Sequence, residues 1–227
     1  MNVNRHPTSL RSSRSQFLRA FTLVEMLIVI AIMGLMLAMA GTSASSLMTT
    51  LRMKEAMETI GNTMEHARQV AMTSNHEVVF RIYKVKNDMG EDAWRSVEFG
   101  TVKIVTDPAD PEYKDPTAAG FEPSFTAIGA AEHLPEGMVF HSDATYSTLV
   151  NASGTDLIKG TDTGPDGRTR SYVTLKFLPD GRCNLDTSKK WTLTLVKEAD
   201  ATQGGLPANF ATMQLDPATA RIRFYRP

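Results

Sequence analysis

A single carboxylate, Glu25, interrupts the apolar run of residues 21–41, FTLVEMLIVIAIMGLMLAMAG. A helical run of about 20 apolar residues can cross the roughly 30 Å hydrocarbon core of a bilayer. A carboxylate inside such a helix costs about 2.5–3.5 kcal/mol at the centre and less near an end, so it usually serves a function and has a partner. Glu25 is therefore the first candidate functional residue, and we expect its partner to be a cation.

The segment before this run is basic. Residues 1–20 hold four arginines and no acidic residue, which is typical of a cytoplasmic targeting leader. An ordinary secretory signal has its cleavage site after the apolar run, whereas the strongest candidate junction here, between Ala20 and Phe21, lies before it. The apolar run would therefore remain in the processed chain.

The block Phe21-Thr22-Leu23-Val24-Glu25, followed directly by the apolar run, resembles type IV prepilins and type II secretion pseudopilins. The resemblance implies that a prepilin peptidase cuts between Ala20 and Phe21 and methylates the new amino terminus, although the family more usually has Gly before the cut. It also implies that Glu25 neutralises the terminal amine of a neighbouring subunit and so sets the register of assembly, since an opposite charge offsets much of the cost of burial. The alternative is a plain signal anchor whose Glu reaches the membrane interface.

Length and composition suit one membrane helix and one globular domain. The chain has 227 residues, of which 42% are hydrophobic and 22% charged, enough for a core. Removal of the leader leaves 20 basic and 25 acidic residues, a net charge of −5, so we expect no nucleic-acid partner. The only cysteine, Cys183, excludes an intramolecular disulfide; many type IV major pilins have one, so a pseudopilin or minor pilin is favoured. We interpret Cys183 as a core or edge residue rather than a reactive thiol.

A single long helix is predicted from residue 21 to about residue 74, because no proline occurs between Pro7 and Pro108. Its second part carries an amphipathic stripe, which we expect to pack on the sheet of the domain rather than to form a coiled-coil seam. The resemblance implies that the helix can loosen at a glycine, for which Gly34 is the best candidate; close helix packing at this small residue is an equal alternative. The residues of the stripe are Leu47, Leu51, Met57, Ile60, Met64, Ala67 and Ala71.

The fold class predicted is α+β: a long N-terminal helix packed on a small antiparallel sheet domain, as in pilins. The domains are a leader (1–20), a transmembrane or filament-core helix (21–41), an amphipathic continuation (42–74) and a periplasmic β-rich domain (75–227). Surface loops are expected at 107–131 and 151–170, where Pro, Gly and Asp are dense. Strands are expected at 76–84, 96–105, 137–141, 171–178, 182–185, 191–197 and 220–226.

Weaker similarities concern the domain. Four short blocks resemble the H-type minor pseudopilins, although Ala220 stands where the last block normally has Gly. A looser similarity links the domain to the Verru/Chthon cassette protein D group, whose role is not established. The blocks are residues 66–71 (HARQVA), 134–137 (LPEG), 175–182 (LKFLPDGR) and 216–224 (DPATARIRF).

Nothing in the sequence indicates catalysis. The histidines lack metal-ligand spacing, and the acids of residues 151–170, which could hold calcium, do not have EF-hand spacing, so we predict no enzyme activity, metal or other cofactor. The predicted function is a minor pseudopilin of a type II secretion pseudopilus, in the inner membrane with its C-terminal domain in the periplasm. Its partners would be prepilin peptidase, other pilin or pseudopilin subunits, an inner-membrane assembly platform and lipid. The alternatives are a type IV minor pilin for adhesion, motility or DNA uptake, and a membrane-tethered binding domain that does not polymerise.

Overall fold

The computed structural model describes residues 21–227, except residues 88, 112–114, 116, 118–123, 152–156 and 202–203; it also leaves the side chains of residues 39–46 undescribed. The predicted leader, including Ala20, lies outside the described residues. The chain divides into two units, Met1–Ser46 and Leu47–Pro227. Each unit is described by itself.

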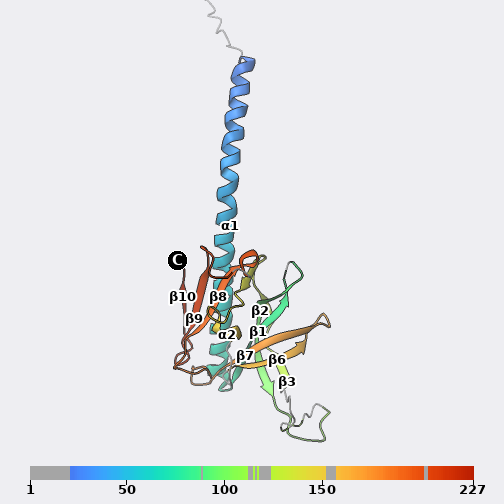
Figure 1. The fold of residues 1–227 in the computed structure, drawn as a ribbon. Helices are drawn as coiled ribbons and strands as arrows, with labels where there is room; N and C mark the ends of the chain where they lie inside the picture. The colour runs from blue at the N-terminus through green and yellow to red at the C-terminus, as the bar shows by residue number, and fades with distance from the viewer. Residues whose placement is uncertain are drawn as a thin grey trace, which may run out of the picture. The chain divides into compact units, whose positions relative to one another are not determined.

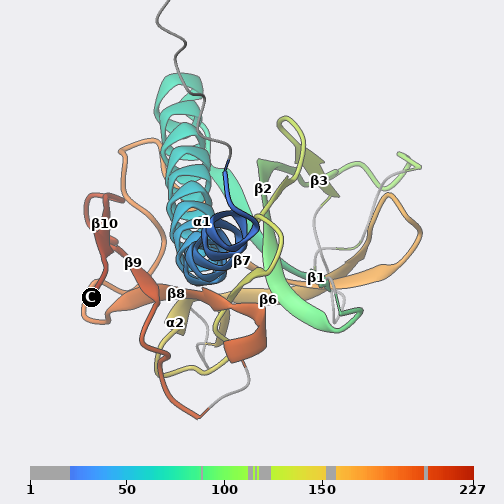
Figure 2. The same cartoon turned by 90° about the horizontal axis from the view of Figure 1, so that it is seen from above.

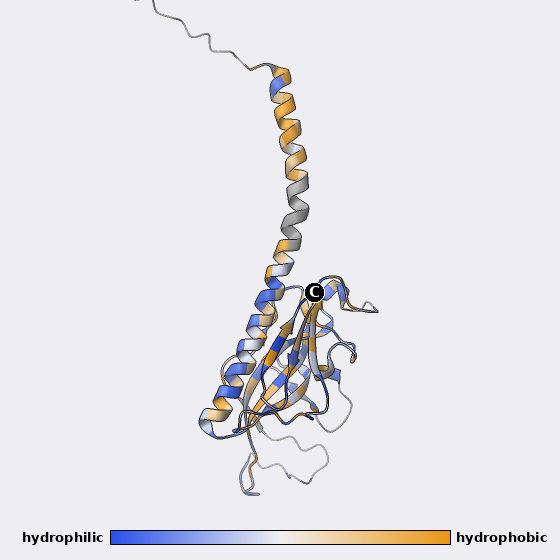
Figure 3. Ribbon diagram, turned by 90° about the vertical axis from the view of Figure 1, so that its left-hand side faces the viewer, coloured by the Kyte–Doolittle hydropathy of each residue, from blue (hydrophilic) through white to orange (hydrophobic). Residues whose placement is uncertain are grey.

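The first helix, α1 (Leu23–Ser74), has 52 residues and confirms the long helix expected from the sequence. The backbone is helical through Gly34. The helix ends before Asn75, whose φ of 55° is left-handed, a conformation that Asn tolerates at the end of a helix. The described part of the first unit is coloured almost entirely as hydrophobic in Figure 3.

The second unit contains two antiparallel sheets, which confirms the α+β class (Figure 1). Sheet A has the strand order β3-β2-β1-β7-β6, with β4 also paired to β2, and sheet B has the order β10-β9-β8-β5. A short helix, α2 (Thr148–Asn151), and a 3₁₀ turn, η1 (Glu198–Asp200), complete the described elements. The strands of sheet A are β1 (Val78–Lys86), β2 (Asp92–Lys103), β3 (Ser124–Ala127), β4 (Glu132–His133), β6 (Ile158–Thr163) and β7 (Thr169–Phe177). Those of sheet B are β5 (Met138–Phe140), β8 (Trp191–Lys197), β9 (Ala211–Leu215) and β10 (Ile222–Tyr225).

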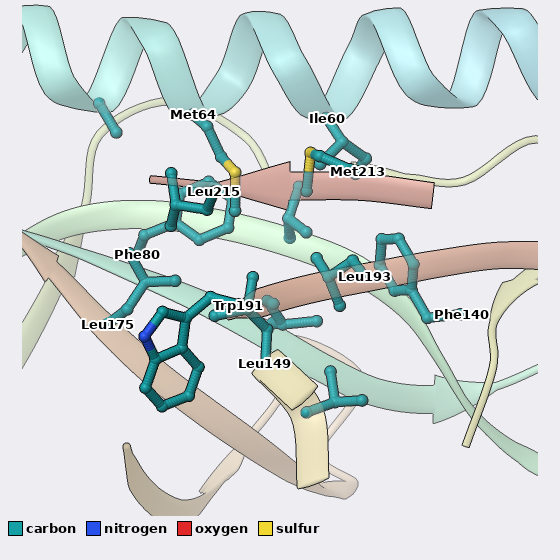
Figure 4. Close-up of a cluster of buried hydrophobic side chains, with 14 of the residues drawn as sticks. Ile60, Met64, Phe80, Phe140, Leu149, Leu175, Trp191, Leu193, Met213 and Leu215 are labelled. Atoms are coloured by element: carbon teal, nitrogen blue, oxygen red, sulfur yellow. The ribbon is translucent and has the colours of Figure 1, made fainter. Parts of the chain in front are cut away.

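One hydrophobic core joins the second half of α1 to both sheets. In Figure 2, β9 and β10 lie to one side of α1 and β2 and β3 to the other. Figure 4 shows Ile60 and Met64 of α1 directed toward Met213 and Leu215 of sheet B, with Phe80 of sheet A beside them. The helix residues of this core recur every three or four positions, as one face of a helix requires. They are Met53, Ala56, Ile60, Met64, Ala67 and Ala71.

The predicted stripe therefore packs on the sheets, but its first members do not. Leu47 and Leu51 are 58% and 51% exposed, and Met57 is only partly buried. The buried face of the helix instead begins at Met53 and continues with Ala56, and both residues belong to the hydrophobic core.

The strand predictions are confirmed except at residues 182–185, where only one isolated bridge, between Cys183 and Phe177, is present. The amide of Cys183 donates to the carbonyl of Pro217 at 3.0 Å, so the ladder does not continue. The loop prediction for 151–170 is wrong, because β6 and the start of β7 lie there; β6 is a polar edge strand without an apolar face. The predicted loop 107–131 also contains the short strand β3.

Candidate processing and assembly site

Thr22 starts α1. Its carbonyl oxygen accepts hydrogen bonds from the amides of Glu25 at 3.1 Å and Met26 at 3.2 Å, and its hydroxyl Oγ1 accepts from the amide of Glu25 at 3.2 Å. A threonine at this position caps the helix, because it satisfies an amide that has no partner within the first turn. The sequence reasoning overlooked Thr22, although Thr-x-x-Glu before an apolar run is a known signature of a helix start.

Glu25 lies in the first turn of α1, where its backbone is held by Thr22. A carboxylate in this turn is stabilised by the positive end of the helix dipole, by about 0.3–1 kcal/mol at an exposed position. The side chain of Glu25 is exposed, and within the described part of the chain it has no hydrogen-bond or ion-pair partner. Its charge is thus available to a group from outside.

Large apolar side chains surround the described part of this helix on every face. All of those from Phe21 to Leu37 are exposed by 40% or more, with Leu23 at 82% and Leu37 at 73%. A helix that is apolar all round is normally buried, in the core of a larger body or in a membrane. The first unit therefore needs a covering that the chain itself does not supply within its described residues.

The predicted site residues lie along this one segment. Ala20 is outside the described residues, whereas Phe21 is the first described residue and directly precedes the cap, Thr22. A cut before Phe21 would place a free amine next to the helix start, about one turn from Glu25. Gly34 is helical, and a Cβ at this position would have no atom within 4 Å, so a side chain would fit there. Whether the helix loosens at Gly34 stays a prediction.

Residues 19–41 match the prokaryotic N-terminal methylation motif. This match covers the predicted junction, Glu25 and the whole apolar run, and it supports a type IV pilin-like or prepilin-like subunit. Such a motif implies processing by prepilin peptidase and assembly with other pilin subunits. No curated protein and no solved structure matches the chain.

The motif also suggests membrane anchoring. Among the residues that the structure describes, however, no helix has the length and apolar character that a membrane crossing requires.

The remaining candidate residues belong to the framework of the domain. Cys183 is buried, and this burial raises the pKa of its thiol to about 11, so the thiolate is disfavoured. In the predicted loop of residues 151–170, Asp162 forms an ion pair with Arg170 at 3.0 Å and Asp166 with Arg168 at 3.8 Å. No group of three or more potential metal ligands occurs among the described residues.

Proposed function

We propose that the chain is a prepilin-like structural subunit that is cleaved and N-methylated at Phe21 and enters a type II secretion pseudopilus as a minor pseudopilin. One observation carries the proposal: an apolar helix, exposed on all its described faces, begins with a capped turn that holds a single unpaired carboxylate, Glu25. Packing such helices side by side would remove their apolar surface from water.

Charge pairing explains why the carboxylate is retained. Burial of Glu25 alone among apolar helices would cost several kcal/mol, and a neighbour's freed Phe21 amine at hydrogen-bonding distance would offset much of that cost. Each subunit offers one amine and one carboxylate about one turn apart. Pairing between neighbours would therefore fix the axial offset between their helices.

The cysteine content and net charge of the chain favour a secretion pseudopilus over a type IV pilus. It has one cysteine and cannot close the C-terminal disulfide of many major pilins, and after cleavage its net charge would be −5, which disfavours binding to DNA. In this proposal residues 21–41 anchor the subunit in the inner membrane before assembly, and the β-rich domain faces the periplasm. The subunit has no catalytic role, and its further partner is the inner-membrane assembly platform.

The deciding experiment is the N-terminal sequence and mass of the full chain, expressed in a bacterium that has a prepilin peptidase and recovered from its membranes. We expect a chain that begins at N-methyl-Phe21. The control is the same expression in a strain without the peptidase, which should give an intact leader. A leader that persists in both strains, or a cut after Gly41, would contradict the proposal.

A second measurement separates the secretion machine from a type IV pilus. Deletion of the gene in its own host should abolish the export of folded proteins through the outer membrane while surface pili persist. Loss of surface filaments with export intact would instead favour a type IV minor pilin.

A further inference from the structure

A cavity of about 500 Å³ lies at one end of sheet A. The antiparallel order β2-β1-β7-β6 brings the ends of β1 and β6 together with the starts of β2 and β7. The register pairs Lys84 of β1 with both Trp94 of β2 and Ser171 of β7, so the two hairpins flank the same space. The β4 residue His133 contributes to the wall from the outer side of β2.

The lining of the cavity is strongly basic. Its charged residues are five cations, Lys84, Lys86, Arg95, Arg168 and Arg170, and two acids, Asp92 and Asp166. The chain as a whole has 24 basic and 25 acidic residues, so this excess of cations is local. A concave surface lined by one sign of charge concentrates ligands of the opposite sign.

The β6–β7 hairpin turn holds two of these cations in place. The amide of Gly164 donates to the carbonyl of Arg168 at 2.8 Å, and Gly167 has a φ of 74°, which glycine adopts without strain. A Cβ at Gly164 would lie 2.8 Å from Oδ1 of Asp166 and 3.0 Å from Cδ of Arg170. A larger residue at position 164 would therefore displace the side chains of Asp166 and Arg170.

Arg170 is fixed further by its contacts with neighbouring strands. Its Nε and Nη2 donate to the two carboxylate oxygens of Asp162 at 3.0 and 3.1 Å, and its guanidinium lies 4.0 Å from the ring centre of Tyr83. Asp162 also pairs with the buried Arg81 at 3.4 Å. The Asp162 carboxylate is therefore shared by two guanidinium groups, and Glu98 adds a weaker electrostatic attraction to Arg170.

Lys84 is the cation that is least compensated. Lys86 pairs with Asp92 at 3.0 Å and Arg168 with Asp166 at 3.8 Å, so both lining acids are already engaged. Lys84 is half-buried, and among the described residues its side chain has no hydrogen-bond or ion-pair partner. A partly buried ammonium group without a counter-charge favours an anion from solution.

We propose that this cavity binds a small organic polyanion that carries at least two carboxylate or phosphate groups. Its volume is within the range of about 300–1,000 Å³ that is usual for small-molecule sites. Val85, Ala131 and Pro165 supply an apolar part of the wall, which suits a ligand with a carbon skeleton. The proposal goes beyond filament assembly and does not depend on it.

The test is isothermal titration calorimetry of the whole chain in detergent, with citrate and inorganic pyrophosphate as probes and glucose as the neutral control. At least one probe should bind with a Kd below about 1 mM, and added salt should weaken the binding. Lys84→Met keeps the aliphatic stem and removes the charge, and it should weaken binding about tenfold. Lys159→Met is the matched control, because Lys159 is an exposed lysine of the same sheet that does not line the cavity.

Three results would overturn the proposal. The first is the absence of binding by both probes at concentrations up to about 10 mM. The second is an equal loss of binding in Lys159→Met and Lys84→Met, which would indicate diffuse surface charge. The third is tighter binding of a hexaglutamate peptide or duplex DNA than of both probes, which would assign the basic surface to a macromolecule. Thermal unfolding of both variants, compared with the parent chain, establishes that each is folded.

Discussion

The guanidinium of Arg68 in α1 donates a hydrogen bond from Nε to the carbonyl oxygen of Gly181 over 3.2 Å, across 113 residues of sequence. Gly181 closes the Pro179-Asp180-Gly181 turn with a φ of 83°, and its amide donates to the carbonyl of Leu178 at 2.9 Å. Arg68 lies in the block of residues 66–71 and Gly181 in the block of residues 175–182. Their contact gives these blocks one physical role, the docking of α1 on the turn after β7.

Gly181→Ala should therefore destabilise the domain more than an ordinary turn substitution. A left-handed alanine costs about 1–2 kcal/mol, and the new Cβ would also lie 3.3 Å from Sδ of Met72 and 3.5 Å from Nη2 of Arg68. Gly167→Ala is the matched control, since its φ is 74° and a Cβ there would meet no atom within 4 Å. Urea unfolding should show a loss about 0.5 kcal/mol larger for Gly181→Ala, because the Met72 side chain is 46% exposed and can shift to relieve the contact. Equal losses would mean that the contact with α1 adds nothing at this turn.

Ala220 has a backbone conformation that favours glycine. Its φ is 49°, left-handed, although the residue is not glycine and is only 2% exposed. The turn is held by Asp216, whose amide donates to the carbonyl of Arg221 at 2.9 Å and whose Oδ2 accepts from Oγ1 of Thr219 at 2.8 Å. The alanine is tolerated at a cost in backbone strain.

Ala220→Gly should change the free energy of unfolding by less than about 1 kcal/mol, because relief of left-handed strain offsets the loss of a buried methyl group. Ala67→Gly in α1 is the comparison: Ala67 is equally buried but helical, and the same change should cost about 2 kcal/mol. Thermal unfolding of both variants measures the difference. An Ala220→Gly variant as unstable as Ala67→Gly would show that position 220 is not strained.

The thiol of Cys183 should resist alkylation in the folded chain. Burial raises its pKa from 9.0 to about 11, so the folded state retains a proton that the unfolded state releases between these values. Stability from this group is fully present below about pH 9 and is lost as the pH rises toward 11. The rate of reaction with iodoacetamide at pH 8 should be at least tenfold lower in the native chain than in urea. Similar rates in both would contradict the buried assignment.

The elements that could be predicted are those with a local pattern. The helix α1 follows from the absence of proline, and strands such as β1 and β8 follow from their β-branched and aromatic residues. The strand β6 was missed because its sequence, IKGTDT, has no apolar alternation; it is held at the sheet edge by its pairing with β7 and by the contacts of Asp162 with side chains of β1. The local sequence of β6 carries no signal that predicts its pairing with β7.

The candidate functional residues also differ in whether the sequence alone could identify them. Phe21 and Glu25 could be identified because the motif is contiguous, and Thr22 had a readable signal in the Thr-x-x-Glu spacing. The basic cavity could not be found from the sequence, because Lys84, Arg95 and Arg170 lie on three strands that only the sheet register brings together. Charge in a linear sequence does not reveal where cations converge.

Glu25→Gln should leave cleavage intact and exclude the subunit from filaments. Glutamine keeps the size and helix propensity of the side chain but removes the charge that would pair with a neighbour's amine. The measurement is the ratio of subunit in sheared filaments to subunit in membranes, together with the N-terminal mass. We expect the filament fraction to fall at least tenfold while the mass still shows a start at N-methyl-Phe21, because loss of one strongly coupled charge pair corresponds to more than about 1.4 kcal/mol.

Thr22→Val is the control that separates charge pairing from the helix start. It removes the hydroxyl that accepts from the amide of Glu25, which should weaken the first turn by about 1 kcal/mol but leave the carboxylate in place. Incorporation should therefore fall only slightly, and less than for Glu25→Gln. If Glu25→Gln enters filaments as well as the parent chain, the carboxylate has no role in register and the plain-anchor interpretation holds. If Thr22→Val is lost from filaments to the same extent, the helix cap rather than the charge is what assembly requires.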